Sequence, residues 1–227
     1  MKLLIDDANI DDIRRLIDLY PIDGVTTNPS ILAKAGRDPV EVLKEIRGVI
    51  GKERLLFVQA IPPDAHGMIE DARAIVRLLG ENTVVKLPAV PEGFKAIRAL
   101  SAEGIPTCGT VVYTPMQACL AAKAGADYVA PYVNRIDNMG CDGVGVARQI
   151  QDILSIYGMK ARVLAASFKN SRQVLELCAC GIECVTCAPA VIDGLVKNPA
   201  VDGAIDDFAR DFARVAGEGR SMADLIG

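Results

Sequence analysis

The stretch TVVKLPAVPEGFKAIRALSAEGIPTCGTVVY, residues 83–113, contains the repeating unit of the predicted fold. It begins with an apolar run rich in β-branched residues at 83–88 and ends with a second such run at 106–113. The intervening residues 91–104 open with proline and glutamate and close with a glycine, which is the punctuation of a helix. The stretch therefore predicts a strand, a helix and a second, parallel strand.

The same alternation extends along the whole chain in both directions. Apolar runs that resemble buried strands occur at 3–6, 24–28, 54–60, 83–88, 106–113, 127–133, 162–168 and 183–188. Helical patterns occur at 9–20, 38–50, 64–80, 91–104, 114–125, 143–158, 170–181 and 189–197. This pattern predicts an α/β protein in which residues 1–227 form a single (β/α)8 TIM-barrel domain.

An amphipathic segment at 200–214 follows the last barrel helix. It predicts an extra C-terminal helix within a helix and tail of residues 199–227. Its apolar face needs a partner, which is either the barrel or another subunit.

Composition narrows the class of protein. Hydrophobic residues make up 51% of the chain and aromatic residues only 4%, so we expect a globular protein with an aliphatic core. The formal net charge of −4 argues against a nucleic-acid surface, although one local basic pocket can still bind a small anion. Asp6 and Asp7 interrupt the first apolar stretch, and no stretch has the length of a membrane span, so we expect a cytoplasmic protein without membrane contact.

Four of the seven cysteines, Cys178, Cys180, Cys184 and Cys187, have a spacing that raises the alternative of a metal or iron–sulfur site. The first two fall near the end of a predicted helix. The other two fall on a predicted strand, where side chains three residues apart face opposite sides. We therefore expect no metal site here and interpret the cysteines as small, reduced core residues.

Polar residues stand at the ends of the first seven predicted strands, where TIM barrels carry their catalytic groups. Each alone has a structural interpretation, such as helix capping by Asp6 or Asn28, or an ion pair between Arg135 and Asp137. Because they converge on one end of the barrel, we predict a common site. The eighth strand ends in Ala-Pro and offers no polar group. The set comprises Asp6, Asn28, Gln59, Lys86, Thr110, Tyr132, Arg135, Ser167 and Lys169.

Lys86 is the most informative of these residues because it interrupts a run that is otherwise apolar. It can extend its amine to the rim of the barrel. Alternatively the amine is buried, and burial disfavours the charged form. A neutral lysine amine attacks a carbonyl carbon and forms a Schiff base, which then draws electrons from the neighbouring carbon.

Schiff-base chemistry requires further groups, and the chain offers candidates for each. Asp6 is the carboxylate available for proton transfer at a substrate hydroxyl. Asn28 is suited to bind hydroxyl groups. We expect Gln59, Thr110 and Tyr132 to hold a water that relays protons, and Arg135, Ser167 and Lys169 to bind a phosphate.

Five further motifs stand in order along the chain: GVTTNPS (24–30), VVKLP (84–88), EGIPTCGTVVY (103–113), AGADYVAPYVNRID (124–137) and VLAASFKN (163–170). With these motifs, residues 1–213 resemble the transaldolase family and, more closely, its fructose-6-phosphate aldolase branch. The resemblance implies a class I aldolase without metal or cofactor, with Lys86 as the Schiff-base lysine and the other residues in the roles above. It implies reversible cleavage of fructose 6-phosphate to dihydroxyacetone and glyceraldehyde 3-phosphate. It also implies homopentamers that pair into decamers, with the C-terminal helix on a neighbouring subunit.

Two positions bear on the branch. Transaldolases usually have Glu at the Gln59 position and Phe at the Tyr132 position, so this chain carries the aldolase residues at both. Longer family members often have Arg at the Lys169 position, and lysine is the less directional phosphate ligand. Three alternatives stay open: a transaldolase that transfers a dihydroxyacetone unit, an enzyme for a sulfonated sugar analogue, and a non-catalytic sugar-phosphate binding protein.

Overall fold

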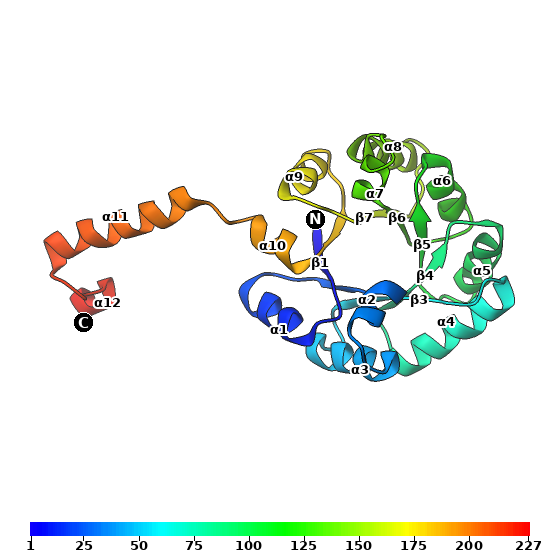
Figure 1. Cartoon of the computed structure of the whole chain (residues 1–227), viewed down its shortest axis with the longest axis horizontal. Helices are drawn as coiled ribbons and strands as arrows, with labels where there is room; N and C mark the ends of the chain where they lie inside the picture. Colours follow the sequence, from blue (N-terminus) through cyan, green and yellow to red (C-terminus); the bar gives the residue numbers. More distant parts are fainter. The chain divides into compact units, whose positions relative to one another are not determined.

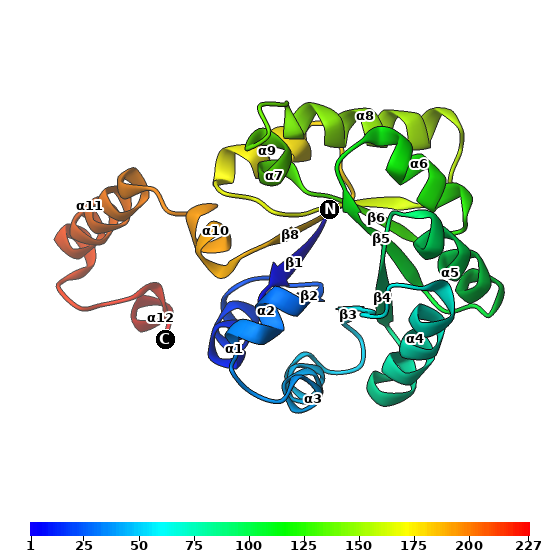
Figure 2. The same ribbon diagram turned by 45° about the vertical axis from the view of Figure 1, so that its right-hand side comes forward.

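The computed structural model describes residues 1–227, which divide into one compact unit of Met1–Ile192 and a second of Asp193–Gly227. In the first unit eight parallel strands form a closed barrel in which the strand order follows the chain order. Helices surround the strands, as Figures 1 and 2 show. The strands are β1 (Lys2–Asp6), β2 (Gly24–Thr26), β3 (Leu55–Gln59), β4 (Thr83–Pro88), β5 (Thr107–Val112), β6 (Tyr128–Pro131), β7 (Arg162–Ala165) and β8 (Cys184–Cys187).

At least one helix follows each of the eight strands, as the sequence pattern predicts. No helix in the structure has both the length and the apolar character needed to cross a membrane. The helices are α1 (Ile10–Leu19), α2 (Pro29–Lys34), α3 (Pro39–Ile50), α4 (Ala65–Leu79), α5 (Pro91–Ala102), α6 (Pro115–Lys123), α7 (Val133–Asp137), α8 (Gly143–Ile156), α9 (Ser171–Ala179) and α10 (Pro189–Gly194).

The TIM-barrel prediction is confirmed, and the corrections are local. The short helices α2 and α7 were not predicted. The predicted second strand, 24–28, ends early at Thr26 because Asn28 caps α2, and Pro29 is its first residue. The predicted sixth strand, 127–133, ends at Pro131, and α7 follows it.

The interior of the barrel is packed by residues from seven of the strands. Phe57 and Tyr128 meet edge to face, with ring centroids 5.1 Å apart. The side chains around them are aliphatic or cysteine, which agrees with the low aromatic content. The buried cluster consists of Leu4, Phe57, Val84, Cys108, Tyr128, Ala130, Leu164 and Cys184.

The cysteines divide into two groups. Cys108, Cys119, Cys184 and Cys187 are buried, so their prediction as core residues is confirmed. It is wrong for Cys141, which is exposed, and only partly right for Cys178 and Cys180, which are half-buried. On β8, Cys184 lies in the barrel cluster and Cys187 projects to the opposite face. No three His, Cys, Asp or Glu side chains gather where a metal ion would fit.

The second unit confirms the predicted C-terminal helix and adds a short one. Helix α11 spans Pro199–Ala216 and α12 spans Met222–Ile226, and no residue of either helix is buried. The apolar stripe of α11 includes Val201, Ile205, Phe208 and Val215, all of which are exposed. The packing of this stripe on a neighbouring subunit stays a prediction.

Candidate functional site

The polar side chains of the barrel interior form a layer directly above the apolar cluster. Because side chains alternate along a strand, the residue two positions after each cluster residue again points inward. Leu4 is thus followed by Asp6, Phe57 by Gln59, and Val84 by Lys86. Continuing around the barrel, the same rule places Thr110, Tyr132 and Thr186 in this layer.

Lys86 lies inside this layer and does not extend to the rim. Its residue is 5% exposed, and its Nζ donates a hydrogen bond to the carbonyl oxygen of Thr27 at 3.0 Å. The neighbouring strand places Gln59 directly beside it in the ladder. The alternative of a surface amine is therefore wrong, and the side chain has the enclosed position that a Schiff-base lysine requires.

The Asp6 carboxyl group lies within the electrostatic field of this amine. Protein encloses the carboxyl group, and this burial raises the pKa of Asp6. The positive charges of Lys86 and Arg135 and a hydrogen bond from Thr26 act in the opposite direction and lower the pKa. A carboxyl group with a raised pKa beside a buried amine is suited to accept and return a proton.

Thr110 and Tyr132 form a second hydroxyl pair at the same level. The Thr110 Oγ1 and the Tyr132 phenol oxygen are 3.0 Å apart, and both residues are buried. Thr110 lies in a β-bulge of β5, where three steps from Gly109 to Val112 match two steps on β6. Val111 has a φ of +60° in the bulge, which is a strained conformation for a β-branched residue.

Tyr132 is held by further contacts on its ring. The Arg135 guanidinium carbon lies 4.5 Å from the ring centroid, a cation–π geometry. The Tyr113 ring meets it edge to face with centroids 5.8 Å apart. These contacts fix the phenol, which leaves its hydroxyl in one position relative to Thr110.

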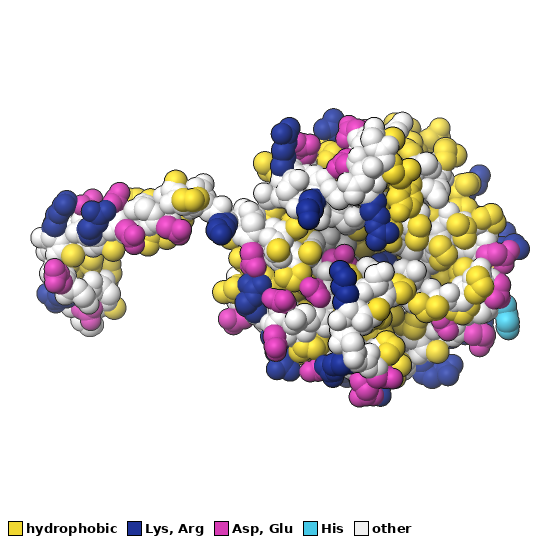
Figure 3. All heavy atoms as spheres, viewed as in Figure 1, with side chains coloured by type: hydrophobic (Ala, Val, Ile, Leu, Met, Phe, Trp, Pro, Cys, Tyr) yellow, Lys and Arg dark blue, Asp and Glu magenta, His cyan; other side chains and the backbone are white.

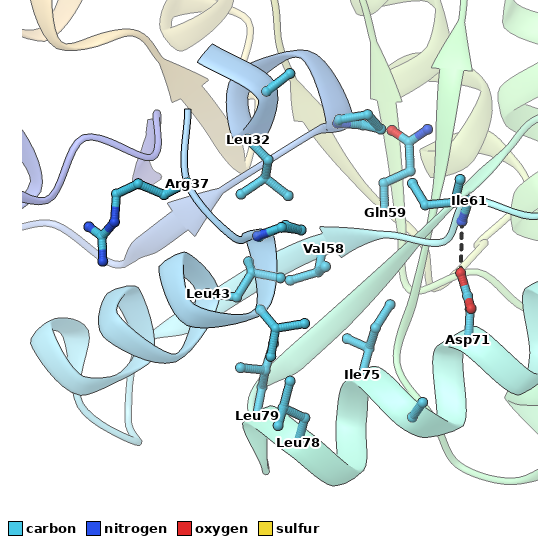
Figure 4. Close-up of a pocket in the computed structure, with 15 residues that line it drawn as sticks. Leu32, Arg37, Leu43, Val58, Gln59, Ile61, Asp71, Ile75, Leu78 and Leu79 are labelled. Carbon is cyan, nitrogen blue, oxygen red and sulfur yellow. Dashed lines mark hydrogen bonds between the residues drawn. The ribbon is translucent and has the colours of Figure 1, made fainter. Parts of the chain in front are cut away.

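Gln59 is half-buried and lies beside Lys86. Outside the barrel wall at this point, α2, α3, α4 and β3 enclose an apolar groove of about 470 Å³. Figure 4 shows the Gln59 amide pointing away from Leu43, Val58 and Leu79, which line that groove. The only charged residues along it are Arg37 and Asp71, and the Asp71 carboxylate accepts the Ile61 N–H at 3.0 Å. The groove therefore offers little chemistry, and the reactive groups lie inside the barrel.

The three predicted phosphate ligands come from neighbouring segments after β6 and β7. Arg135 and Lys169 are exposed and Ser167 is half-buried. The carbonyl oxygen of Ser167 accepts the N–H of Asn134 at 2.8 Å, which ties the two segments together. In Figure 3 several Lys and Arg side chains stand near the middle of the barrel between the positions of α2 and α7.

The alternative ion pair between Arg135 and Asp137 is not formed. Asp137 instead accepts hydrogen bonds from the Gly143 N–H at 2.8 Å and from Gln173 Nε2 at 2.6 Å. Gln173 Oε1 in turn accepts the N–H of Lys169 at 2.8 Å. Asp137 thus organises the loops that carry the basic residues, and the Arg135 charge stays available for an anion.

Asn28 can serve both predicted roles, which are capping of a helix and binding of a substrate hydroxyl. Its Oδ1 accepts the N–H of Ile31 at 3.0 Å and caps α2. The amide nitrogen is the donor end of this side chain, and it is the part that suits a substrate hydroxyl. The lone histidine, His66, is exposed at the start of α4 and appears at the edge of the molecule in Figure 3, far from this layer.

Three threonines of the site were missed in the sequence. Thr27 supplies the acceptor for Lys86, and Thr26 donates to Asp6 Oδ1 at 2.6 Å. The Thr186 Oγ1 lies 2.7 Å from the Thr26 Oγ1, so the expectation that the eighth strand contributes no polar group is wrong. The strand period was the available signal, since Thr186 lies two positions after the inward-facing Cys184.

The arrangement thus provides a buried amine, a carboxyl group, a hydroxyl pair and basic groups at the rim. This is a set for imine chemistry on an anionic carbonyl compound. A comparison with protein-family models matches residues 3–224 to the model described as "Transaldolase/Fructose-6-phosphate aldolase".

Proposed function

The chain belongs to the transaldolase/fructose-6-phosphate aldolase family and is an enzyme that acts on sugar phosphates, and we propose that its activity is that of a class I aldolase. The proposed reaction is the reversible cleavage of fructose 6-phosphate to dihydroxyacetone and glyceraldehyde 3-phosphate. The observation that carries this proposal is the buried Lys86 amine with the Asp6 carboxyl group in its electrostatic field.

In the proposed mechanism the Lys86 amine adds to the C2 ketone of the substrate, and loss of water gives an iminium ion. Asp6 accepts the proton of the C4 hydroxyl as the C3–C4 bond breaks. The bonding electron pair passes to the iminium and forms an enamine, while glyceraldehyde 3-phosphate leaves. The proton on Asp6 then passes to the enamine carbon through a water held by Gln59, Thr110 and Tyr132. Hydrolysis of the resulting iminium returns free Lys86 and dihydroxyacetone, with Asp6 ionised again.

The transaldolase alternative shares every step up to the enamine. A transaldolase keeps the enamine until a second aldehyde adds to it, whereas an aldolase protonates it. The hydroxyl contact between Thr110 and Tyr132 supports protonation, because it orients a phenol O–H in the reactive layer.

The test combines trapping with product analysis. The protein is incubated with fructose 6-phosphate and borohydride, digested, and searched by mass for an adduct on Lys86. In a second assay fructose 6-phosphate is supplied without acceptor, and free dihydroxyacetone is measured. The proposal requires an adduct on Lys86 and release without acceptor. Turnover only with erythrose 4-phosphate, with formation of sedoheptulose 7-phosphate, would establish the transaldolase instead.

The Gln59→Glu and Tyr132→Phe variants should shift the enzyme from release toward transfer. Tyr132→Phe removes the phenol hydroxyl beside Thr110, and Gln59→Glu alters the ligands of the relay water. We expect the ratio of release to transfer to fall about 10²- to 10⁴-fold in either variant, the usual size of a positioned proton-transfer effect. The ratio is measured as dihydroxyacetone against sedoheptulose 7-phosphate at fixed erythrose 4-phosphate. An unchanged ratio in both variants would remove these two residues as determinants of the branch.

The Lys169→Met variant should weaken binding of phosphorylated substrates without slowing the chemical step. Loss of one charged phosphate ligand is expected to raise KM for fructose 6-phosphate about tenfold, with kcat unchanged. Steady-state kinetics with fructose 6-phosphate and with unphosphorylated fructose check this result, since only the former should respond. Lys160→Met is the matched control, because Lys160 is an exposed lysine that precedes β7, at the opposite end of this strand from Lys169.

We also propose that the enzyme is a homo-oligomer in which the α11 stripe packs on another subunit. The support is the exposure of four large apolar residues on one helix, Phe208 at 72% and Val215 at 84% among them, together with the resemblance to oligomeric relatives. Sedimentation velocity should show an assembly larger than a dimer, and Phe208→Asp should reduce its size. A monomeric wild-type protein at micromolar concentration would contradict the proposal.

A further inference from the structure

A chain of two buried threonine hydroxyls leads from β8 to the Asp6 carboxyl group. The Thr26 Oγ1 donates to Asp6 Oδ1 at 2.6 Å, and the Thr186 Oγ1 lies 2.7 Å from the Thr26 Oγ1. Thr26 is 0% exposed and Thr186 is 2% exposed, so bulk water does not compete for these hydroxyls. The three residues come from β1, β2 and β8, which are adjacent in the barrel.

When Asp6 is ionised, the number of available protons determines which hydroxyl group donates in each of these two hydrogen bonds. A hydroxyl group carries a single proton, and the Thr26 proton lies in the bond to the carboxylate. The contact between Thr26 and Thr186 is therefore a hydrogen bond only if Thr186 donates. Donation by Thr186 also polarises the Thr26 hydroxyl and strengthens its bond to Asp6.

We propose that Thr186 is a positioning residue for Asp6, because its hydroxyl keeps the Thr26 hydroxyl directed at the Asp6 carboxylate. Thr186 itself is two hydrogen bonds away from the reacting group. It acts on the charge state of Asp6, which accepts the substrate proton in the proposed aldolase reaction. The inference therefore rests on that proposed function and deepens it.

Other groups also face Asp6, and the test must separate their effects. Lys86 on β4 and Arg135 on α7 favour the ionised carboxylate, whereas Asp7, which directly follows β1, disfavours it. The Cys187 thiol on β8 is a further titratable group within the electrostatic field of Asp6. The pKa of this thiol is raised to about 12, mainly by burial. None of these groups is altered by removing the Thr186 hydroxyl, so a change in Asp6 titration in that variant reports the hydroxyl chain.

Thr186→Val is the central variant, because valine keeps the shape of threonine and removes the donor. We expect the acidic limb of the profile of kcat/KM against pH to move upward by about half a pH unit in Thr186→Val. In Thr26→Val, which removes the direct hydrogen bond, we expect about one unit. KM for fructose 6-phosphate at alkaline pH should stay unchanged, and Thr186→Ser should restore the wild-type limb.

Thr107→Val is the matched control. Thr107 is also a buried strand threonine, at 0% exposure, but its hydroxyl has no hydrogen-bond partner. Its replacement should leave the profile in place. If Thr186→Val and Thr107→Val shift the limb equally, or if neither shifts it, the inference is wrong.

An activity-independent measurement separates this inference from the proposed function. The loss of thermal stability caused by Thr186→Val should be larger above the acidic limb, where Asp6 is ionised, than below it. In an Asp6→Asn background the loss should be independent of pH. If the wild-type protein has no aldolase activity but the stability loss of Thr186→Val still depends on pH, the proposed function is wrong and the role of the hydroxyl chain stands. Equal pH dependence in both backgrounds would overturn the hydroxyl chain.

Discussion

Replacement of Lys86 with arginine or methionine is expected to reduce fructose 6-phosphate cleavage by at least about 10⁴-fold and to abolish borohydride trapping. The reason is chemical, since neither side chain forms an imine. Arginine keeps a positive charge beside Asp6 and a donor for the Thr27 carbonyl oxygen, so a loss of activity in this variant isolates the nucleophile from the charge.

Methionine provides the complementary control, because it fills the space of lysine without its charge. The variant leaves the Thr27 carbonyl oxygen without its 3.0 Å donor, which costs about 1 to 3 kcal/mol. Removal of a buried charge offsets part of this cost. Circular dichroism and the thermal midpoint should therefore show a folded protein. If Lys86→Arg retains even a tenth of the wild-type cleavage rate, the reaction does not pass through a Lys86 imine.

The barrel could be predicted from the sequence because each strand has the same simple pattern. Eight apolar runs separated by capped helical patterns allow few other arrangements, and the order of strands follows from right-handed crossovers between neighbours. Lys86 could also be predicted from local sequence, because a charged residue within a buried apolar run is unusual and can be recognised from its sequence neighbours alone. The strand ends then supplied Asp6, Gln59 and Thr110.

The missed features depend on contacts between distant segments. Thr186 looks like an ordinary strand residue until β8 pairs with β1 and places it beside Thr26. The bulge at Val111 follows from the register between β5 and β6. No residue pattern in the sequence predicts this register. Tyr113 matters through its contact with the ring of Tyr132, nineteen positions later. The sequence shows which residues are unusual for their element, but it does not show which ordinary residues meet.

Asp6→Asn is expected to lower the rate of carbon–carbon bond cleavage by about 10²- to 10⁴-fold, while the imine with Lys86 still forms. Asparagine keeps an oxygen acceptor for the Thr26 hydroxyl but cannot take the proton of the substrate hydroxyl. Borohydride trapping should thus yield an adduct on Lys86 with the mass of the intact six-carbon sugar phosphate. Wild-type protein should also yield the three-carbon dihydroxyacetone adduct. A three-carbon adduct that accumulates as fast in the variant as in the wild type would show that another group accepts the proton.

The same variant should be at least as stable as the wild type at neutral pH. The pKa of Asp6 is raised in the folded protein because burial disfavours its charge. A carboxyl group of this kind stabilises the fold below the pKa of the unfolded state, about 3.9, and that contribution is lost as the pH rises through the raised value. Asp6→Asn removes the charged form, so its thermal midpoint should exceed that of the wild type at pH 7.5 and the difference should shrink toward pH 4. Loss of cleavage together with unchanged or higher stability is the combination that a catalytic carboxyl predicts, whereas a structural carboxyl would lose both.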